Sequence, residues 1–555
     1  MKQVLGTFVM LCLFFSLSAN NIGEKRFSIK KNGKTLRIPY HRNHSLGNKN
    51  EAIKRAIIVI HGMNRNADGY YESIVNASKS ATCSGETPEV NPLDYTIVIS
   101  PTLMMEDDID EHNLGEDYPF WGSSWRYGAL SKNTNENPRK VRISSFEVID
   151  AILEKLETNF PNLTHIVITG HSAGGQFTNR YMAIGKGHNK LMAKGKISIE
   201  GLVMNPSSYL YMDNKRYDAS TKKFQVPTTA SSCTGYNEYP YGFEDIDWDY
   251  FSNRTAATLR TGIKAKKVYY LLGGNDNDPQ SSSLANDCED NLEGSQRLER
   301  GNRYQMHLKK YFGDDIVKNH RFFTIAGIGH SNSKMYKSKK GQEILFGTLV
   351  TDIENNCYGA VEIAGITWMA ENLKVTKCND GTQIQSLNLG KTSNASAMYW
   401  HDNNTSSANS EKYGPLYNWA TVSKCDVCPS GWRVPSESEW RLMMRSWYGK
   451  KDEKGNTISP DSPFKGAGLA YAAKQLRAVD NAWPEVESNT NSTGFSALPG
   501  GWIWNGGFSY FGQRSAWWAI EDGAAKFAKI SRGEQGTWTG NAGKADILYV
   551  RCIRE

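Results

Sequence analysis

The sequence has no apolar run of the roughly 20 residues that a membrane-spanning helix requires. It also has no run of basic residues: its net charge of +7 comes from 65 basic and 58 acidic residues spread along the chain. Nucleic-acid-binding proteins usually gather their basic residues in runs or on one face. With 39% hydrophobic and 22% charged residues, the composition excludes disordered, collagenous and coiled-coil chains. We therefore expect no transmembrane segment and no nucleic-acid partner.

Tryptophan is scarce in one part of the chain and abundant in another. Three tryptophans precede residue 357, and the other twelve lie in the last 199 residues. The length of 555 residues also exceeds the roughly 250–300 residues at which a single hydrophobic core stops growing. The sequence therefore predicts two domains, 20–352 and 353–555, after a short leader at 1–19.

The leader has the features of a secretory signal peptide. Lys2 supplies the positive charge, Val4–Phe15 is a short apolar stretch, and Ser16–Ala19 is an exit of small residues. We therefore expect the mature chain to be secreted, either into the medium or onto the cell surface.

Cysteine is also rare, with nine residues, of which eight remain after loss of the leader. An even number in an exported chain favours disulfides. Cys425 and Cys428 have a metal-like spacing, but no second pair and no nearby histidine completes a zinc set. We expect disulfides and no metal or other cofactor; the pairing stays open.

Apolar runs rich in β-formers recur through the first 330 residues and alternate with helix-length segments. After a hairpin at Arg26–Asn43, the runs are Ala56–Ile60, Thr96–Ser100, His165–Thr169, Leu202–Met204, Val268–Leu272 and Phe322–Ala326. The helical segments are Ser144–Phe160, Gly174–Ile184, Glu293–Phe312 and Asn332–Leu349. Continuous apolar runs suit strands covered on both faces. The alternation predicts an α/β domain with a mostly parallel sheet flanked by helices.

The sharpest local motif is Gly170-His-Ser-Ala-Gly174, between a predicted strand and a predicted helix. A sharp strand-to-helix turn needs small neighbours, and it lifts the serine hydroxyl to the carboxyl edge of the sheet. The motif predicts that Ser172 is a nucleophile.

A serine nucleophile needs a base, and the base needs an acid to orient it. His330 follows the last predicted strand, at the edge where α/β sheets present their catalytic loops. Asp276 follows the strand before it and is preferred as the acid, with Asp278 as the alternative. The chain order serine, aspartate, histidine is that of an α/β-hydrolase triad.

Together with His61-Gly62 and Gly329-His330, these residues resemble the α/β-hydrolase family over about residues 25–352. The resemblance implies an oxyanion hole made by the backbone N–H groups of Met63 and Ala173. No triple-glycine run follows His61, which disfavours the hormone-sensitive-lipase-like subgroup.

Two aromatic segments are candidates for the substrate site. Phe120–Tyr127 contains Trp121 and Trp125, and residues 205–255 contain Tyr209 and several other aromatic residues. Aromatic faces with hydroxyl tips suit a sugar or a phenolic acyl group, and a packed cap over the sheet explains them equally well.

The last 199 residues resemble the FISUMP-type paralogous domain, which implies an α+β, C-type-lectin-like fold. The matching blocks are Trp368–Leu373, Tyr413–Trp419, Cys428–Pro435, Gly494–Gly501, Trp517-Trp518 and Val550–Cys552. One helix is expected here, near Glu437–Ser446. Most tryptophans are expected in the core, and Trp502, Trp504 and Trp538 are candidates for a sugar platform.

Taken together, the sequence predicts a secreted serine hydrolase of carboxylic esters, with acetyl or feruloyl esters of plant polysaccharide as the substrate suggested by analogy. A lipase or peptidase on the same triad is the nearest enzymatic alternative. The other alternative is a surface glycan-binding or interaction protein whose C-terminal domain carries the function.

Overall fold

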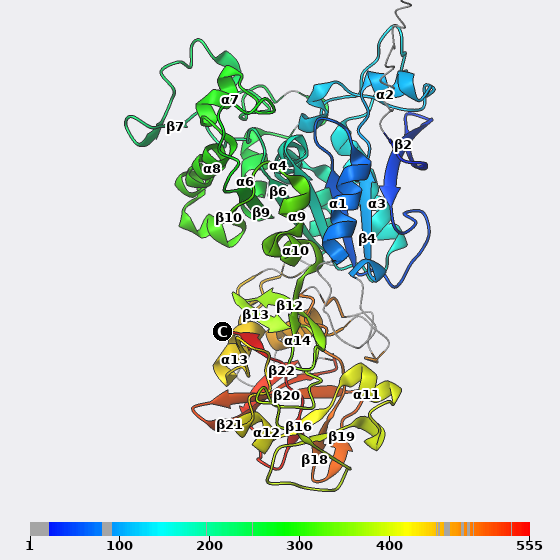
Figure 1. Ribbon diagram of the computed structural model, residues 1–555, viewed down its shortest axis with the longest axis vertical. Helices are drawn as coiled ribbons and strands as arrows, with labels where there is room; N and C mark the ends of the chain where they lie inside the picture. The colour runs from blue at the N-terminus through cyan, green and yellow to red at the C-terminus, as the bar shows by residue number, and fades with distance from the viewer. Residues whose placement is uncertain are drawn as a thin grey trace, which may run out of the picture.

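The computed structural model describes residues 21–79, 92–195, 197–246, 248–252, 254–450, 452, 456–459, 467–478, 482–484, 489–491, 493–533 and 536–555. The predicted signal peptide and Cys83 lie outside these residues. The chain forms two units, which lie one above the other along the long axis in Figure 1. Among the described residues, no helix combines the length and apolar character needed to cross a bilayer.

The first unit is built on an eight-stranded sheet. Its order is β1 (Lys25–Lys31), β2 (Lys34–Arg42), β4 (Thr96–Pro101), β3 (Arg55–Ile60), β5 (His165–His171), β6 (Ser198–Met204), β9 (Lys267–Gly273) and β10 (His320–Ile325). The six strands from β4 to β10 in this order run parallel to one another, and β2 is antiparallel to both of its neighbours, β1 and β4. The predicted mostly parallel sheet is confirmed.

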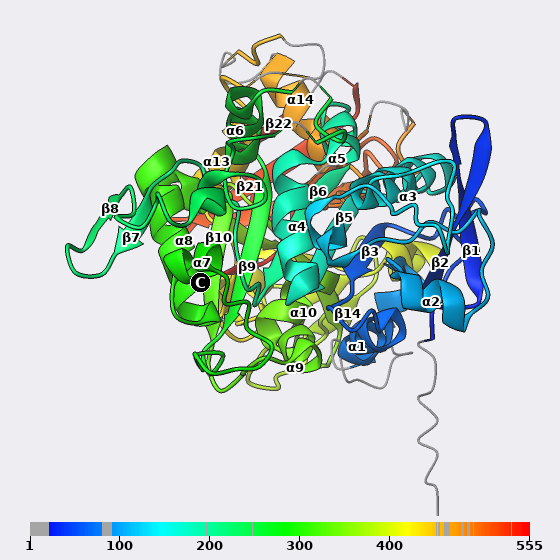
Figure 2. The ribbon, with the colours of Figure 1, turned by 90° about the horizontal axis from the view of Figure 1, so that it is seen from above.

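Helices cover both faces of this sheet, as Figure 2 shows. The helices of this unit are α1 (Ala67–Lys79), α2 (Glu106–Glu111), α3 (Ser145–Asn159), α4 (Ala173–Ile184), α5 (Lys186–Met192), α6 (Ala256–Lys264), α7 (Cys288–Glu293), α8 (Arg297–Phe312), α9 (Asn332–Lys337) and α10 (Lys339–Phe346); of these, α2 and α7 lie beyond the ends of the strands in Figure 1. In β3, Ile58 packs into one core cluster and Ile57 into the other. This two-sided burial explains why the strands read as unbroken apolar runs.

The predicted helix at 332–349 is interrupted. Its first part, α9, ends at Lys337, and the Ser338 hydroxyl caps the next helix by accepting from the Gly341 N–H at 3.1 Å. A serine that caps a new helix has non-helical backbone angles, so the segment forms two short helices.

The second unit begins with β11 (Thr348–Thr351), which pairs with β12 (Cys357–Ile363) just upstream of the predicted boundary at 353. The other strands of that sheet are β13 (Ile366–Met369), β24 (Ile553–Arg554) and β17 (Trp432–Arg433). A second sheet contains β14 (Gln385–Leu387), β15 (Ala397–Tyr399), β16 (Leu416–Asn418), β23 (Ile547–Leu548), β18 (Trp502–Trp504) and β19 (Gly507–Ser509). A third contains β20 (Arg514–Glu521), β21 (Ala524–Ser531) and β22 (Thr537–Asn541).

This unit also has more helix than the sequence predicts. The expected helix is α13 (Glu437–Arg445), and it is accompanied by α11 (Ala408–Tyr413), α12 (Trp419–Lys424) and α14 (Ala467–Leu476). Two of these are short helices that begin after capping residues, Ser407 and Asn418, and segments so short carry little periodicity.

The first unit also contains a small hairpin, β7 (Arg216–Asp218) with β8 (Lys223–Gln225), outside its main sheet.

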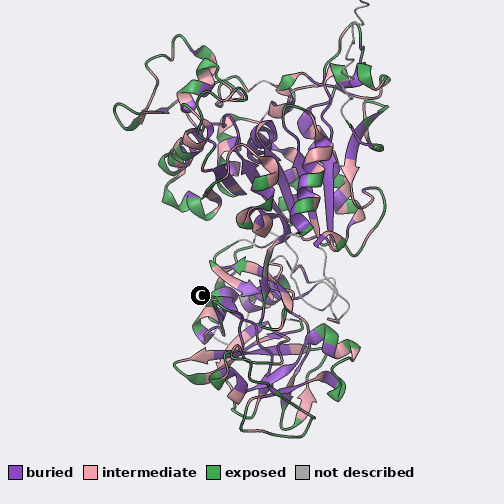
Figure 3. Ribbon diagram, in the orientation of Figure 1, coloured by how far each residue is buried: buried purple, intermediate pink, exposed green. Residues whose placement is uncertain are grey.

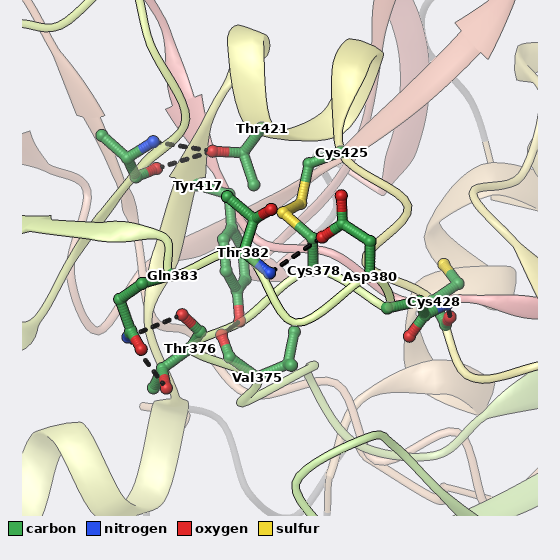
Figure 4. The surroundings of a disulfide bond; sticks show 12 residues. Val375, Thr376, Cys378, Asp380, Thr382, Gln383, Tyr417, Thr421, Cys425 and Cys428 are labelled. Atoms are coloured by element: carbon green, nitrogen blue, oxygen red, sulfur yellow. Dashed lines mark hydrogen bonds between the residues drawn. A yellow bond between two sulfur atoms is a disulfide. The ribbon is translucent and has the colours of Figure 1, made fainter.

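The tryptophans of the second unit mostly belong to its interior. Trp368, Trp440, Trp483, Trp517 and Trp518 are fully buried, whereas Trp504 is 53% exposed. Figure 3 shows the buried interior along the strands. Three disulfides join pairs of cysteines that both lie among the described residues: Cys233–Cys288, Cys378–Cys425 and Cys428–Cys552. Figure 4 shows the bond between Cys378 and Cys425, with Cys428 nearby but not part of it; Cys428 bonds to Cys552 instead.

The second unit contacts the amino ends of the first unit's strands. Arg321, near the start of β10, forms a bidentate ion pair with Glu362 of β12, at 2.7 and 3.0 Å. A Cβ atom placed on Gly494 would lie 3.5 Å from Cε1 of His165, the first residue of β5. The carboxyl ends of the strands therefore lie at the opposite edge of the sheet.

Candidate functional site

Ser172 lies on a sharp turn between β5 and α4, with φ 59° and ψ −120°. The glycines around it are required by contact. A Cβ on Gly170 would come within 2.3 Å of the Gly174 carbonyl, and one on Gly174 within 2.2 Å of the Ile60 oxygen. The turn leaves Ser172 partly exposed while its neighbours His171 and Ala173 are buried. The motif therefore forms a strained strand–turn–helix elbow with its hydroxyl-bearing residue at the carboxyl edge.

His330 and Asp276 are brought together at the same edge. Nδ1 of His330 donates to Oδ2 of Asp276 at 2.7 Å, and the side chains are 23% and 6% exposed. Asp278 is exposed, and its carboxylate accepts from the Gln280 N–H at 2.9 Å, as a turn residue does. The contact thus selects Asp276 as the partner of His330.

Arg297 is a member of the site that the sequence analysis missed. Its Nη1 lies 3.3 Å from Oδ1 of Asp276, and both side chains are nearly fully buried. Nε donates to the Ser207 hydroxyl at 3.2 Å, and Nη2 donates to the Ser283 carbonyl. The guanidinium therefore fixes the carboxylate oxygen that His330 does not use. No local sequence pattern predicts the role of this arginine. It begins a helix and lies 21 residues beyond Asp276, so only the folded structure brings the two together.

Asn205 links the loops of three strands. Its Oδ1 accepts from the Gly273 N–H at 2.8 Å, and its Nδ2 donates to the Gly329 carbonyl at 3.4 Å. Nδ2 also lies 3.3 Å from Nε2 of His171. The His171 ring in turn packs on His330, with centroids 4.4 Å apart. The loop that carries His330 is thereby held against the residue that precedes Ser172.

His171 packs on His330 as a neutral ring. Burial, together with the positive charges of His330 and Arg297, holds its pKa well below 6.5. Since Asn205 donates to Nε2, the single proton of this imidazole lies on Nδ1. His171 therefore places no charge beside His330.

The loop after β3 is fixed by a buried histidine. His61 Nδ1 donates to the Gly62 carbonyl at 2.8 Å, and its Nε2 accepts from the Leu103 N–H at 3.0 Å. Burial lowers the pKa of His61 to about 4. The ring therefore stays neutral at neutral pH, with its proton on Nδ1 and Nε2 free to accept. Arg65 adds an ion pair to buried Asp108 at 2.6 Å, so part of the acidic segment at 106–111 serves to hold this loop.

The two predicted oxyanion donors lie on segments in direct contact. Ala173 is the first residue of α4, so its N–H has no acceptor within the helix. Met63 lies in the loop fixed by His61, with its side chain 38% exposed. A Cβ on Gly174 would lie 2.7 Å from the His61 carbonyl, so the loop packs onto the first turn of α4.

The three predicted substrate-binding aromatics are in the core. Trp121 is 1% exposed and donates to the Ile143 carbonyl at 3.1 Å. Trp125 is fully buried with its ring 4.7 Å from that of His61, and buried Tyr209 stacks on Tyr304. Their packing explains their presence without a ligand, and substrate binding by them stays a prediction.

One group of donors in the described part of the chain has metal-like spacing: Cys233, Cys288 and Glu289. Its two sulfur atoms are joined in a disulfide, which removes the thiolates that a metal would require.

Comparison with known proteins separates the two units. Residues 361–554 match the Fibrobacter succinogenes major domain family. The predicted FISUMP-type resemblance of the second unit is thus confirmed, and its C-type-lectin-like fold stays a prediction. No curated protein has a matching sequence.

Solved structures that are similar to the chain include enzymes that act on polymers. Poly(aspartic acid) hydrolase-1 from Sphingomonas sp. KT-1 is 23% identical, with 58% of this chain and 98% of that one covered and a TM-score of 0.39. LpqC, a poly(3-hydroxybutyrate) depolymerase from Bordetella parapertussis, is 17% identical over 58% and 90% of the two chains, with a TM-score of 0.38. Est1E from Butyrivibrio proteoclasticus is 11% identical over 58% and 97%, with a TM-score of 0.24. The strand order and direction of the sheet themselves give the first unit its α/β-hydrolase fold.

Proposed function

We propose that this protein is a serine hydrolase that cleaves carboxylic esters. The observation that supports this most directly is the hydrogen bond between His330 and Asp276 at the edge where the elbow presents Ser172. A serine in such a turn, a histidine whose Nδ1–H is fixed by a buried carboxylate and an adjacent helix start are the elements of nucleophilic acyl transfer.

The mechanism assigns a task to each group. Nε2 of His330 takes the proton of Ser172 as its hydroxyl oxygen attacks the ester carbonyl, while Asp276 stabilises the resulting imidazolium. The N–H groups of Ala173 and Met63 donate to the oxyanion. His330 then protonates the departing alcohol, and water, activated by the same histidine, releases the acid from the acyl-enzyme.

The substrate that we propose is an acetyl or feruloyl ester of a plant polysaccharide. The secretory leader expected at 1–19 and the disulfides of the structure fit an extracellular enzyme. The attached second unit fits an insoluble polymer, because a binding module keeps an enzyme at such a surface.

The test is a substrate panel with the purified full chain and with Ser172→Ala. The panel contains p-nitrophenyl acetate, acetylated xylan and methyl ferulate, with p-nitrophenyl palmitate and a peptide amide for the lipase and peptidase alternatives. We expect turnover of the short acyl or feruloyl esters and a loss of at least about 10³-fold in the variant. Equal activity in the two proteins would falsify the assignment of Ser172.

The alternative is a surface glycan-binding or interaction protein in which the second unit carries the function. The exposed Trp504 favours some binding role. Absence of turnover for every member of the panel, together with retention on a glycan, would establish this alternative. The partly buried contact between Asp276 and His330 favours an active hydrolase, since a scaffold needs no such arrangement.

A further inference from the structure

The second unit contains a pocket of about 180 Å³ at the end that lies away from the first unit, beside β18 and β19 at the bottom of Figure 1. The residues that line it come from four strands and two loops: Trp502, Trp504, Tyr510, Ala516, Phe527, Lys529, Asp546 and Leu548. Its composition is unusual because flat aromatic side chains surround one cation and one carboxylate.

The aromatic wall is presented to solvent. Trp502 and Tyr510 stack with centroids 4.7 Å apart, and Trp504 and Tyr510 are 53% and 39% exposed. Phe511, the next residue, is 44% exposed. Large apolar side chains gathered at a surface mark interaction sites, and flat rings provide a face on which the C–H side of a sugar ring packs.

Lys529 supplies a positive charge inside this wall. Its Nζ lies 3.7 Å from the centroid of Trp538 and 5.0 Å from that of Trp502. Within the part of the chain that the structure describes, it has neither a hydrogen-bond acceptor nor an ion-pair partner. Burial and the nearby charge of Arg514 lower the pKa of Lys529 to about 8, so the amine is still mostly charged at neutral pH. The ammonium is thus held by aromatic faces and lacks the anion that would complete its environment.

Asp546 sets a limit on the ligand's charge. Its carboxylate accepts from the Gly543 N–H at 2.8 Å and borders the pocket. A carboxylate beside the ligand repels a densely charged anion such as a phosphate, and it accepts hydrogen bonds from hydroxyl groups. The complementary ligand therefore has a flat apolar face, several hydroxyl groups and a single negative charge.

We propose that this pocket binds a uronic-acid residue of an acidic polysaccharide, with the sugar ring on Trp502, Trp504 and Tyr510 and its carboxylate on Lys529. Asp546 accepts from the sugar hydroxyl groups. This binding activity goes beyond the proposed ester hydrolysis and does not depend on Ser172. It differs from a general glycan platform because it requires a charge on the sugar.

The test uses the full chain with probes that carry no ester, so the result is independent of hydrolysis. Binding of unesterified tri-galacturonic acid and of neutral xylotriose is measured by calorimetry, and retention is measured by electrophoresis in polygalacturonate gels. We expect binding of the acidic trimer and no measurable binding of the neutral one. Lys529→Met, which keeps the aliphatic contacts, weakens binding about 10-fold or more.

Two controls separate the pocket from general charge and folding effects. Lys526→Met removes a cation from the same strand, but its side chain projects to the other face and pairs with Glu437; it is expected to bind as the parent does. Trp504→Ala weakens binding, and Trp504→Tyr restores part of it. Equal binding of both trimers, or unchanged binding by Lys529→Met, would overturn the proposal. Preferential binding of free ferulate over the trimer would also overturn it, in favour of an aromatic acid.

Discussion

Asp276 receives a hydrogen bond from Nδ1 of His330 on one oxygen, at 2.7 Å, and lies 3.3 Å from Nη1 of Arg297 on the other. The carboxylate is thus clamped between the base that it orients and a cation that fixes its own position. We therefore expect substitution of Asp276 and substitution of Asp278 to have different effects on kcat.

Asp276→Asn is expected to lower kcat for a soluble ester by about 10⁴-fold, because an amide no longer holds the tautomer of His330 that accepts the serine proton. Asp278→Asn is the matched control and keeps near-parental kcat, since its carboxylate only caps a turn. Steady-state kinetics on p-nitrophenyl acetate distinguish the two. A large loss in Asp278→Asn with little loss in Asp276→Asn would refute the assigned triad.

Arg297→Met should reduce kcat with little change in KM, because the arginine contacts Asp276, the acid of the proposed triad, and acts through it. It should also lower the free energy of unfolding by about 3 kcal/mol, since a buried carboxylate loses its cation. Arg297→Lys restores part of kcat. Arg303→Met on the same helix removes a pair with Glu299 and a contact with the Tyr217 ring, neither of which touches Asp276, and serves as the control. An equal effect on kcat from both variants would argue against the positioning role.

Stability is expected to fall in mild acid because several histidines are buried as neutral rings. Burial lowers the pKa of His320 to about 4, against the 6.5 of an unfolded histidine. Between these values only the unfolded chain takes up the proton, so the free energy of unfolding falls as the pH drops from about 6.5 to 4. This residue contributes about 3 kcal/mol to the fall.

Denaturant unfolding of His320→Gln over pH 4 to 7 tests this. The variant should show a shallower dependence than the parent. Identical slopes in the two proteins would mean that His320 is not held neutral.

The Cys428–Cys552 bond closes a loop with a sequence separation of 124 residues. Such a bond lowers the entropy of the unfolded chain and thereby stabilises the folded state by about 5 kcal/mol. The double variant Cys428→Ser/Cys552→Ser should therefore lower the melting temperature of the second unit and leave ester hydrolysis by the first unit unchanged. Calorimetry with a parallel activity assay checks both, and parental melting of both units would contradict the expectation.

The elbow was predictable because every requirement of its chemistry is local. A strand, a turn with glycines at 170 and 174 and a helix are contiguous in sequence, and the clashes that a side chain would make arise within that segment and the adjoining strand end. The parallel sheet was predictable for a related reason: burial on both faces leaves unbroken apolar runs.

Residues that act across long stretches of chain were not predictable. Asn205 connects His171, Gly273 and the loop before His330, and no local pattern distinguishes it from any asparagine after a strand. The depth at which the aromatic residues are buried was likewise not predictable. Trp121, Trp125 and Tyr209 have the composition expected of a sugar site, but burial is decided by tertiary packing, which places all three in the core.

The ion pair between Arg321 and Glu362 joins the two units at the ends of the strands that carry no catalytic loop. The segments that hold Ser172, Asp276 and His330 lie at the opposite ends of the strands, so the attachment of the second unit does not shape them. In the function that we propose, a long polymer approaches Ser172 without passing the second unit. In that function the second unit is a tether and not a lid over Ser172.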